Sequence, residues 1–156
     1  MLNRRIASSS DIEDLLSLLE DAKLQQKRHG IVQWNMTYPT KKDIEKDVLN
    51  GVLFMYFSNE ELIGAVTVRT EDVTLYIERI MVVGTNTGKG YASQIVLNVI
   101  HEARLKKCLC IQTTTNHTNF AMRKILSNNN FDEVGRNLKS GREHFGDFIN
   151  YRRLLS

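Results

Sequence analysis

The segment Met81-Val-Val-Gly-Thr-Asn-Thr-Gly-Lys-Gly-Tyr-Ala-Ser93 decides how this sequence folds. An apolar run stops in glycines and small polar residues, and an apolar-periodic segment starts at once. That order predicts a strand, a tight turn and a helix N-terminus in direct succession. Because the first amide hydrogens of a helix have no partner within it, and its dipole is positive there, such a corner suits a phosphate group. The segment therefore predicts a site for a phosphate-bearing cofactor.

Two common phosphate-binding motifs do not fit this segment. The phosphate loop of nucleoside triphosphatases has four residues between its first Gly and its Gly-Lys pair, and then Ser or Thr. Here only residues 85–87 separate Gly84 from Gly88, and Gly90 takes the hydroxyl position. The dinucleotide fingerprint has Gly or Ala where Ser93 stands, and an acidic residue about 20 positions further on. Residues 108–115 contain no acid, so neither motif is present.

Hydrophobic periodicity divides the rest of the chain into helices and strands. Ser10 and Glu13 fit a capping box, and the apolar positions behind them predict a helix over residues 12–28. The expected elements, in order, are a first strand near Arg5, that helix, a shorter helix between Thr40 and Asn50, strands at 53–57, 62–69 and 73–83, a helix at 91–106, a strand at 109–114, a helix at 119–127, and strands at 131–135 and 143–154.

The order of these elements predicts the fold class. Strand 73–83, helix 91–106 and strand 109–114 form one crossover, so we expect those two strands to be parallel. The hairpins before the crossover are expected to be antiparallel. The sequence thus predicts an α/β fold of the mixed α+β kind, with a mostly antiparallel sheet, a central parallel β-α-β crossover and helices on both faces.

Length and composition favour a single soluble domain over residues 1–156. Hydrophobic residues make up 42% and charged residues 25% of the chain, as in ordinary globular proteins. The net charge is only +3, which predicts no nucleic-acid partner, and no apolar run approaches the roughly 18 residues of a membrane span. Cys108 and Cys110 are expected to be buried thiols in a reducing cytoplasm. The four histidines show no metal-ligand spacing, so no metal site is predicted.

Three motifs resemble those of the GNAT N-acetyltransferase superfamily. Residues 87–92, Thr-Gly-Lys-Gly-Tyr-Ala, match its acetyl-CoA motif Gln/Arg-x-x-Gly-x-Gly/Ala except at the first position. The segment from Asn119 to Phe131 resembles the superfamily's Asn-x-x-Ala-x-x-x-Tyr-x-x-x-Gly-Phe motif. The Gln33-Trp-x-x-x-Tyr-Pro39 segment is similar to one in a bacterial branch of the superfamily. The resemblance covers nearly the whole chain and implies a GNAT-like fold.

The resemblance implies where acetyl-CoA binds. The pantetheine arm would lie along the strand end and hydrogen-bond the main chain of Met81, Val82 and Val83. The diphosphate would be held by the backbone amides of a seven-residue stretch, comprising Thr87, Gly88, Lys89, Gly90, Tyr91, Ala92 and Ser93. Thr87 replaces a longer Gln or Arg side chain, so we expect weaker cofactor binding. Asn119 would contact the arm, or would serve only as a helix N-cap.

Catalytic roles follow less directly. Strand alternation places Tyr76, Glu78 and Ile80 on one face. The resemblance implies that Glu78, directly or through water, accepts the proton of the attacking amine. The alternative is a solvated or salt-bridged strand Glu. Since an ordinary Glu has a pKa near 4.3, the base role needs a raised pKa or a water relay.

The superfamily's general-acid Tyr falls at Leu126, which cannot donate a proton. Tyr76, Tyr91 or Tyr151 could serve instead, or the thiolate could leave unassisted. With another tyrosine as the proton donor, or with an unassisted thiolate, the domain would still be an acetyltransferase. A domain that binds acetyl-CoA without rapid turnover is the alternative.

Trp34 and Tyr38 lie in the segment that borders the acceptor in this superfamily, where they would shape an amine pocket or cover the core. The expected reaction is direct attack of a primary amine on acetyl-CoA in a ternary complex. The acceptor is left open between small molecules, peptides and protein lysines. A homodimer, with the C-terminal strand pairing across a two-fold axis, is a further hypothesis.

Overall fold

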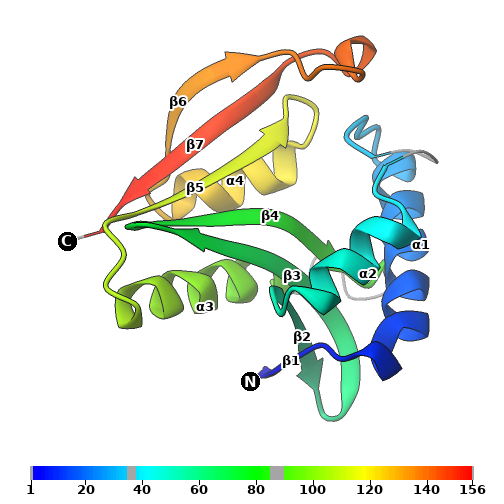
Figure 1. Cartoon of the computed structure of the whole chain (residues 1–156). Coiled ribbons are helices and arrows are strands. Elements are labelled where there is room, and N and C mark those ends of the chain that lie inside the picture. Colours follow the sequence, from blue (N-terminus) through cyan, green and yellow to red (C-terminus); the bar gives the residue numbers. More distant parts are fainter. Residues whose placement is uncertain (1, 35–37, 85–89, 156) are drawn as a thin grey trace.

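A seven-stranded sheet carries helices on both faces in the computed structural model of the chain, which describes residues 2–34, 38–84 and 90–155 (Figure 1). The strands are β1 (Asn3–Ile6), β2 (Leu53–Ser58), β3 (Glu61–Glu71), β4 (Thr74–Val82), β5 (Cys110–Asn116), β6 (Asp132–Asn137) and β7 (Phe148–Leu154). The helices are α1 (Ile12–Arg28), α2 (Lys41–Leu49), α3 (Tyr91–Leu105) and α4 (Phe120–Asn128), with short 3-10 turns η1 (Ser9–Asp11) and η3 (Glu143–Phe145).

The sheet order is β1-β2-β3-β4-β5-β7-β6. Only β4 and β5 pair in parallel within the described residues, from Thr74 opposite Cys110 to Ile77 opposite Thr113. The predicted fold class and the parallel crossover are therefore confirmed. β7 lies between β5 and β6, so both of its edges are already paired and it is not free to pair across a two-fold axis.

The start of α1 differs from the prediction. The capping box is formed by Ser8 and Asp11, not by Ser10 and Glu13, because the chain enters the helix through the η1 turn. The Asp11 carboxylate accepts hydrogen bonds from the Ser8 amide at 2.8 Å and from both terminal nitrogens of Arg5 at 2.7 and 2.8 Å. The guanidinium holds the pKa of Asp11 well below its ordinary value. This contact ties the end of β1 to the start of α1.

The last predicted strand is shorter than expected. Residues 143–145 form the η3 turn, and β7 begins only at Phe148. Gly146 ends the turn with a φ of 77°, a backbone conformation that no regular strand contains. The segment that joins β6 to β7 is therefore a structured connection rather than part of a strand.

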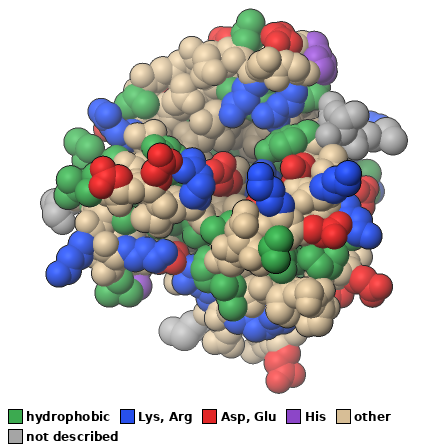
Figure 2. All heavy atoms as spheres, viewed as in Figure 1, with side chains coloured by type: hydrophobic (Ala, Val, Ile, Leu, Met, Phe, Trp, Pro, Cys, Tyr) green, Lys and Arg blue, Asp and Glu red, His purple; other side chains and the backbone are tan. Residues whose placement is uncertain are grey.

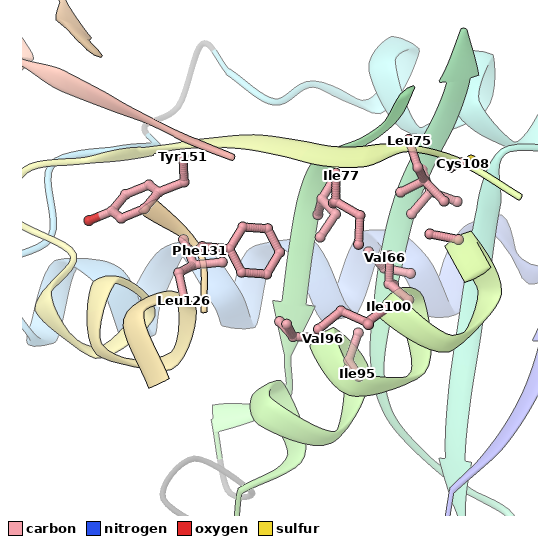
Figure 3. Close-up of a cluster of buried hydrophobic side chains, with 14 of the residues drawn as sticks. Val66, Leu75, Ile77, Ile95, Val96, Ile100, Cys108, Leu126, Phe131 and Tyr151 are labelled. Atoms are coloured by element: carbon pink, nitrogen blue, oxygen red, sulfur yellow. The ribbon is translucent and has the colours of Figure 1, made fainter. Parts of the chain in front are cut away.

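Two buried clusters fill the space on either side of the sheet. On one face α3 presents a stripe of apolar side chains to β3, β4 and β5, and Figure 3 shows Leu126, Phe131 and Tyr151 continuing this cluster beneath the end of the sheet. The members of the α3 stripe are Ile95, Val96, Val99, Ile100 and Ala103. On the other face α1 and α2 pack against β2 and β3. The buried face of α3 is the one that its periodicity predicts, whereas in α2 Ile44 is buried but Leu49, expected on the same apolar face, is exposed.

No helix in the described part of the chain combines the length and the apolar character that crossing a bilayer requires.

A buried ion pair fastens α2 to the sheet. Asp47 of α2 is only 7% exposed, and its carboxylate accepts hydrogen bonds from the Arg79 guanidinium of β4 and from the Thr67 hydroxyl of β3 at 2.9 Å. Arg79 also donates to the Tyr38 phenol at 2.9 Å. Burial lowers the pKa of Arg79, but its bonds with Asp47 and Tyr38 outweigh this and raise it overall, so the arginine stays charged.

We expect Asp47→Ala to lower the free energy of unfolding by about 3 kcal/mol, because it leaves a buried guanidinium without its countercharge. The double variant Asp47→Ala/Arg79→Met should recover much of that loss, since it also removes the guanidinium charge that the single variant leaves unpaired. Urea unfolding followed by circular dichroism measures both, with the exposed α2 residue Glu45 changed to Ala as the control. A loss below about 1 kcal/mol in the single variant would contradict a structural role for the pair.

Candidate active site

β4 and β5 separate halfway along their length. Their pairing ends at Ile77 and Thr113, where the Thr113 hydroxyl donates to the Ile77 carbonyl oxygen at 3.0 Å. Beyond this point the described part of β4 pairs only with β3, and β5 pairs only with β7. The sheet therefore opens into a gap, and main-chain groups of β4 border it.

A β-bulge sits where the gap begins. The strand register leaves Glu78 without a partner in β3, between Ile77 and Arg79. Ile77 and Ile80 both pack into the cluster under α3, although residues three apart in a regular strand point to opposite faces. The prediction that Ile80 shares a face with Tyr76 and Glu78 is therefore wrong, because the extra residue inverts the alternation.

Glu78 forms an ion pair at this bulge. Its carboxylate accepts a hydrogen bond from the Arg69 Nε at 2.9 Å, and the side chain is 37% exposed. Arg69 also pairs with Glu71, and its guanidinium lies 4.4 Å from the centre of the Tyr76 ring. The hydrogen bonds with Glu78 and Glu71 raise the pKa of Arg69. Tyr76 and Glu78 thus share one arginine.

Alternate peptide groups of β4 face the gap. The Val83 amide donates to the Ile63 carbonyl oxygen at 2.9 Å, so it is turned toward β3. Bonded and non-bonded pairs alternate along an antiparallel ladder, which turns the peptide groups of Met81 to β3 as well and those of Val82 and Ile80 away from it. The predicted main-chain contacts at Met81, Val82 and Val83 therefore differ in access to the gap. Ile80, which was not among the predicted main-chain contacts, has the same access as Val82.

Three cavities adjoin one another across the gap. The helix-side cavity, about 550 Å³, lies between α1, the end of β4 and the starts of α3 and α4. The wedge cavity, about 40 Å³, occupies the gap itself and shares with the first the lining residues Gln26, Ile80, Asn119 and Met122. The hairpin-side cavity, about 190 Å³, lies by the β6–β7 hairpin and shares with the wedge Gln33, Ile77, Glu78, Thr113 and Thr114. The wedge cavity therefore lies between the other two.

Residues 13–130 match the family described as the Acetyltransferase (GNAT) family. The chain belongs to the GNAT acetyltransferase family.

Solved structures agree with this fold over almost the full length. A GNAT-family acetyltransferase from Streptococcus agalactiae has a TM-score of 0.84 at 21% identity, covering 99% of this chain and 96% of its own. The paia N-acetyltransferase of Thermoplasma acidophilum, solved in complex with coenzyme A, has a TM-score of 0.81 at 14% identity, covering 99% of each chain. A ribosomal-protein-alanine N-acetyltransferase from Brucella melitensis has a TM-score of 0.76 at 19% identity, covering 98% and 99%. A comparison with curated proteins gives no match.

The corner that begins α3 is the part of the GNAT acetyl-CoA motif that the structure describes. Gly90 is the N-cap, with a φ of 78°, and its carbonyl oxygen accepts the first helical bond, from the Gln94 amide at 3.0 Å. By helix geometry this leaves the amides of three predicted cofactor contacts without a helical partner, namely Tyr91, Ala92 and Ser93. Within the described residues, no heavy atom lies within 4 Å of the position that a Cβ on Gly90 would take, so this part of the chain leaves room at the corner. The remaining predicted contacts, Thr87, Gly88 and Lys89, lie outside the described residues.

Gln33 and Asn119 brace the mouth of the gap. The Gln33 side-chain oxygen accepts hydrogen bonds from the Thr115 hydroxyl at 2.9 Å and from the Asn116 amide at 3.2 Å. Asn119 caps α4 by accepting from the Met122 amide at 3.2 Å, as the N-cap alternative predicts, and it also lines the helix-side and wedge cavities. Gln33 was predicted only as part of a motif, because contacts with residues as distant as Thr115 and Asn116 leave no local signal in the sequence.

Trp34 and Tyr38 border the hairpin-side cavity in different ways. Trp34 is only 8% exposed and belongs to the cluster under α1 and α2, so the core role is confirmed. The Tyr38 hydroxyl accepts a hydrogen bond from Arg79, and the centre of its ring lies 4.2 Å from the guanidinium carbon of Arg142. Both residues therefore shape the cavity wall from fixed positions.

Leu126 lines the wedge cavity and is buried, which places an apolar side chain where the GNAT motif has Tyr. Of the alternative proton donors, Tyr76 and Tyr151 line the hairpin-side cavity, and the Tyr151 hydroxyl accepts from the Arg123 Nε at 3.3 Å. Tyr91 lines none of the three cavities among the described residues.

We expect Gly90→Leu to weaken acetyl-CoA binding at least 100-fold, because a side chain would stand over the free amides at the start of α3. Gly141→Leu is the matched control: Gly141 has the same φ of 78° and equally open space, but it lies in the β6–β7 connection. Calorimetric titration with acetyl-CoA compares the two. Equal affinities would show that the corner does not hold the cofactor.

Proposed function

We propose that this chain transfers the acetyl group of acetyl-CoA to a primary amine by direct attack within a ternary complex. The observation that carries the proposal is the row of adjoining cavities through the gap between β4 and β5. It provides a place for the cofactor on one side and for the amine on the other. The coenzyme A complex of the Thermoplasma acidophilum neighbour supports the choice of cofactor.

The cofactor side is proposed to be the helix-side cavity. The peptide groups of Ile80 and Val82 face the gap and would pair with the amides of the pantetheine arm, as a neighbouring strand would. The open amides of the α3 start would hold the diphosphate, together with the stretch from Thr87 to Gly90. A β4 amide donating to the thioester oxygen would stabilise the oxyanion that forms during attack.

Glu78 is the proposed proton acceptor. It lines both the wedge and the hairpin-side cavity, so an amine that enters from the hairpin side meets it at the gap. The amine nitrogen bonds to the acetyl carbon and loses its proton to Glu78, directly or through water, and the carbon–sulfur bond breaks. Tyr76 or Tyr151 would protonate the departing thiolate, or it would leave unassisted, since thiols are acidic enough to do so. Arg69 orients the Glu78 carboxylate.

We expect Glu78→Gln to lower kcat/KM by 10²–10⁴-fold, the range typical of losing a general base. Glu71→Gln is the matched control, because Glu71 pairs with the same arginine but is not part of the cavity lining. Steady-state kinetics over pH 6–10 compares the variants. Similar activity of the two variants would show that Glu78 serves only in the ion pair with Arg69.

A non-catalytic acyl-CoA-binding domain is the second candidate, favoured by the apolar Leu126 in the wedge. A thiol-release assay over a panel of primary amines separates the two candidates, and we expect amine-dependent release of coenzyme A. Tight acetyl-CoA binding without release on any amine would support the binding domain.

We propose a cytoplasmic location, which the free thiols of Cys108 and Cys110 support. A bacterial branch of the family, as suggested by the segment from Gln33 to Pro39, and a homodimer both stay predictions.

A further inference from the structure

Lys139 and Arg142, two cations of the β6–β7 connection, line the hairpin-side cavity. Neither forms an ion pair within 4 Å with any carboxylate of the described residues. Aromatic rings hold them in place: the Arg142 guanidinium lies 4.2 Å from the Tyr38 ring and 5.1 Å from the Phe148 ring, and the Lys139 ammonium lies 5.3 Å from the Phe148 ring. Figure 2 shows Lys and Arg side chains gathered near the tip of this hairpin, above a hollowed part of the surface.

The two charges repel each other where water is partly excluded. Lys139 is half-buried, and burial followed by the charge of Arg142 lowers its pKa, against a smaller opposing effect of Glu78. Arg69, the remaining cation of the lining, is already neutralised by Glu78 and Glu71. An anion between Lys139 and Arg142 would relieve this repulsion, because each cation would gain an opposite charge at close range.

We propose that the acceptor amine carries a carboxylate, which Lys139 and Arg142 bind while its amino group faces Glu78 at the gap. This inference rests on the proposed function. The planar guanidinium of an arginine matches a carboxylate with two parallel hydrogen bonds. Polyamines are disfavoured, since they would place cations against this pair.

The cavity also limits the size of the acceptor. Its volume of about 190 Å³ is smaller than the roughly 300–1,000 Å³ of pockets for drug-sized ligands. The site therefore selects a small amino acid over a bulky or extended amine.

Acids and their amides test this preference. Alanine and alaninamide, and likewise leucine and leucinamide, differ in the carboxylate. The amides have the less basic amine, so a larger fraction of it is unprotonated and able to attack near neutral pH. We expect kcat/KM to be at least 100-fold higher for the acids. A ratio near one, or a preference for the amides, would overturn the inference. Higher activity on O-phosphoethanolamine than on any acid would overturn the carboxylate assignment.

Substitutions of the two cations test whether they cause the preference for acids over amides. We expect Lys139→Met and Arg142→Met each to reduce the acid-to-amide ratio at least tenfold, mainly through KM, and Lys139→Met/Arg142→Met to abolish it. Lys42→Met removes one exposed positive charge from α2 and should keep the ratio. An unchanged ratio in the double variant would assign the preference elsewhere.

Product binding separates this inference from the proposed function. In the presence of coenzyme A, calorimetry should show N-acetylleucine binding at least tenfold more tightly than N-acetylleucinamide, and the difference should vanish in the double variant. Equal affinities would overturn the carboxylate site whatever the turnover. Absence of turnover on every amine, with this difference intact, would instead refute only the transferase proposal.

Discussion

The candidate active site exists because β4 and β5 stop pairing halfway along their length. A parallel ladder that stops at Ile77 and Thr113 leaves the peptide groups of Ile80 and Val82 without a strand partner. Each unsatisfied backbone group costs about 1–3 kcal/mol when buried, unless water or a guest bonds to it. The gap therefore favours a guest that offers amide groups in strand-like order. The three cavities and the side chains of the candidate site lie around this opening.

Polar contacts from distant parts of the sequence keep the opening in shape. Asp47 anchors α2 to Arg79 just beyond the bulge, and the same arginine holds Tyr38. The gap has two sides, or lips, formed by β4 and β5. On the β5 side, the Gln33 side-chain oxygen accepts a hydrogen bond from Thr115, near the end of the strand. Since each contact joins segments that are at least 30 residues apart, the two lips are fixed by tertiary structure rather than by either strand alone. The proposed direct transfer between two bound ligands requires positions fixed in this way.

The fold was predictable from the sequence because its signals are local. The apolar stripe of α3 and the glycine corner before it lie within one segment, and the crossover rule then gives the parallel pair. The α1 cap was misplaced because Ser8 with Asp11 and Ser10 with Glu13 both fit the same spacing, and only the η1 turn decides between them. Periodicity alone cannot reveal one extra residue at Glu78, since register depends on the partner strand.

The candidate site was predictable in part for the same reason. The contacts expected at Ala92 and Asn119 belong to linear motifs, and both residues line the helix-side cavity. Lys139 and Arg142 carry no such motif, and they reach the hairpin-side cavity only because β7 turns back into the sheet.

That placement of β7 bears on how the molecule is assembled during synthesis. The strand follows β6 in the chain but is inserted between β5 and β6, so β6 has no partner strand, and β5 has only β4, until residues 148–154 have left the ribosome. The crossover and both lips of the opening are encoded earlier. The lining residues of the helix-side cavity all precede β6 in the chain, whereas the wall of the hairpin-side cavity, which includes Phe148, Asn150 and Tyr151, is completed last.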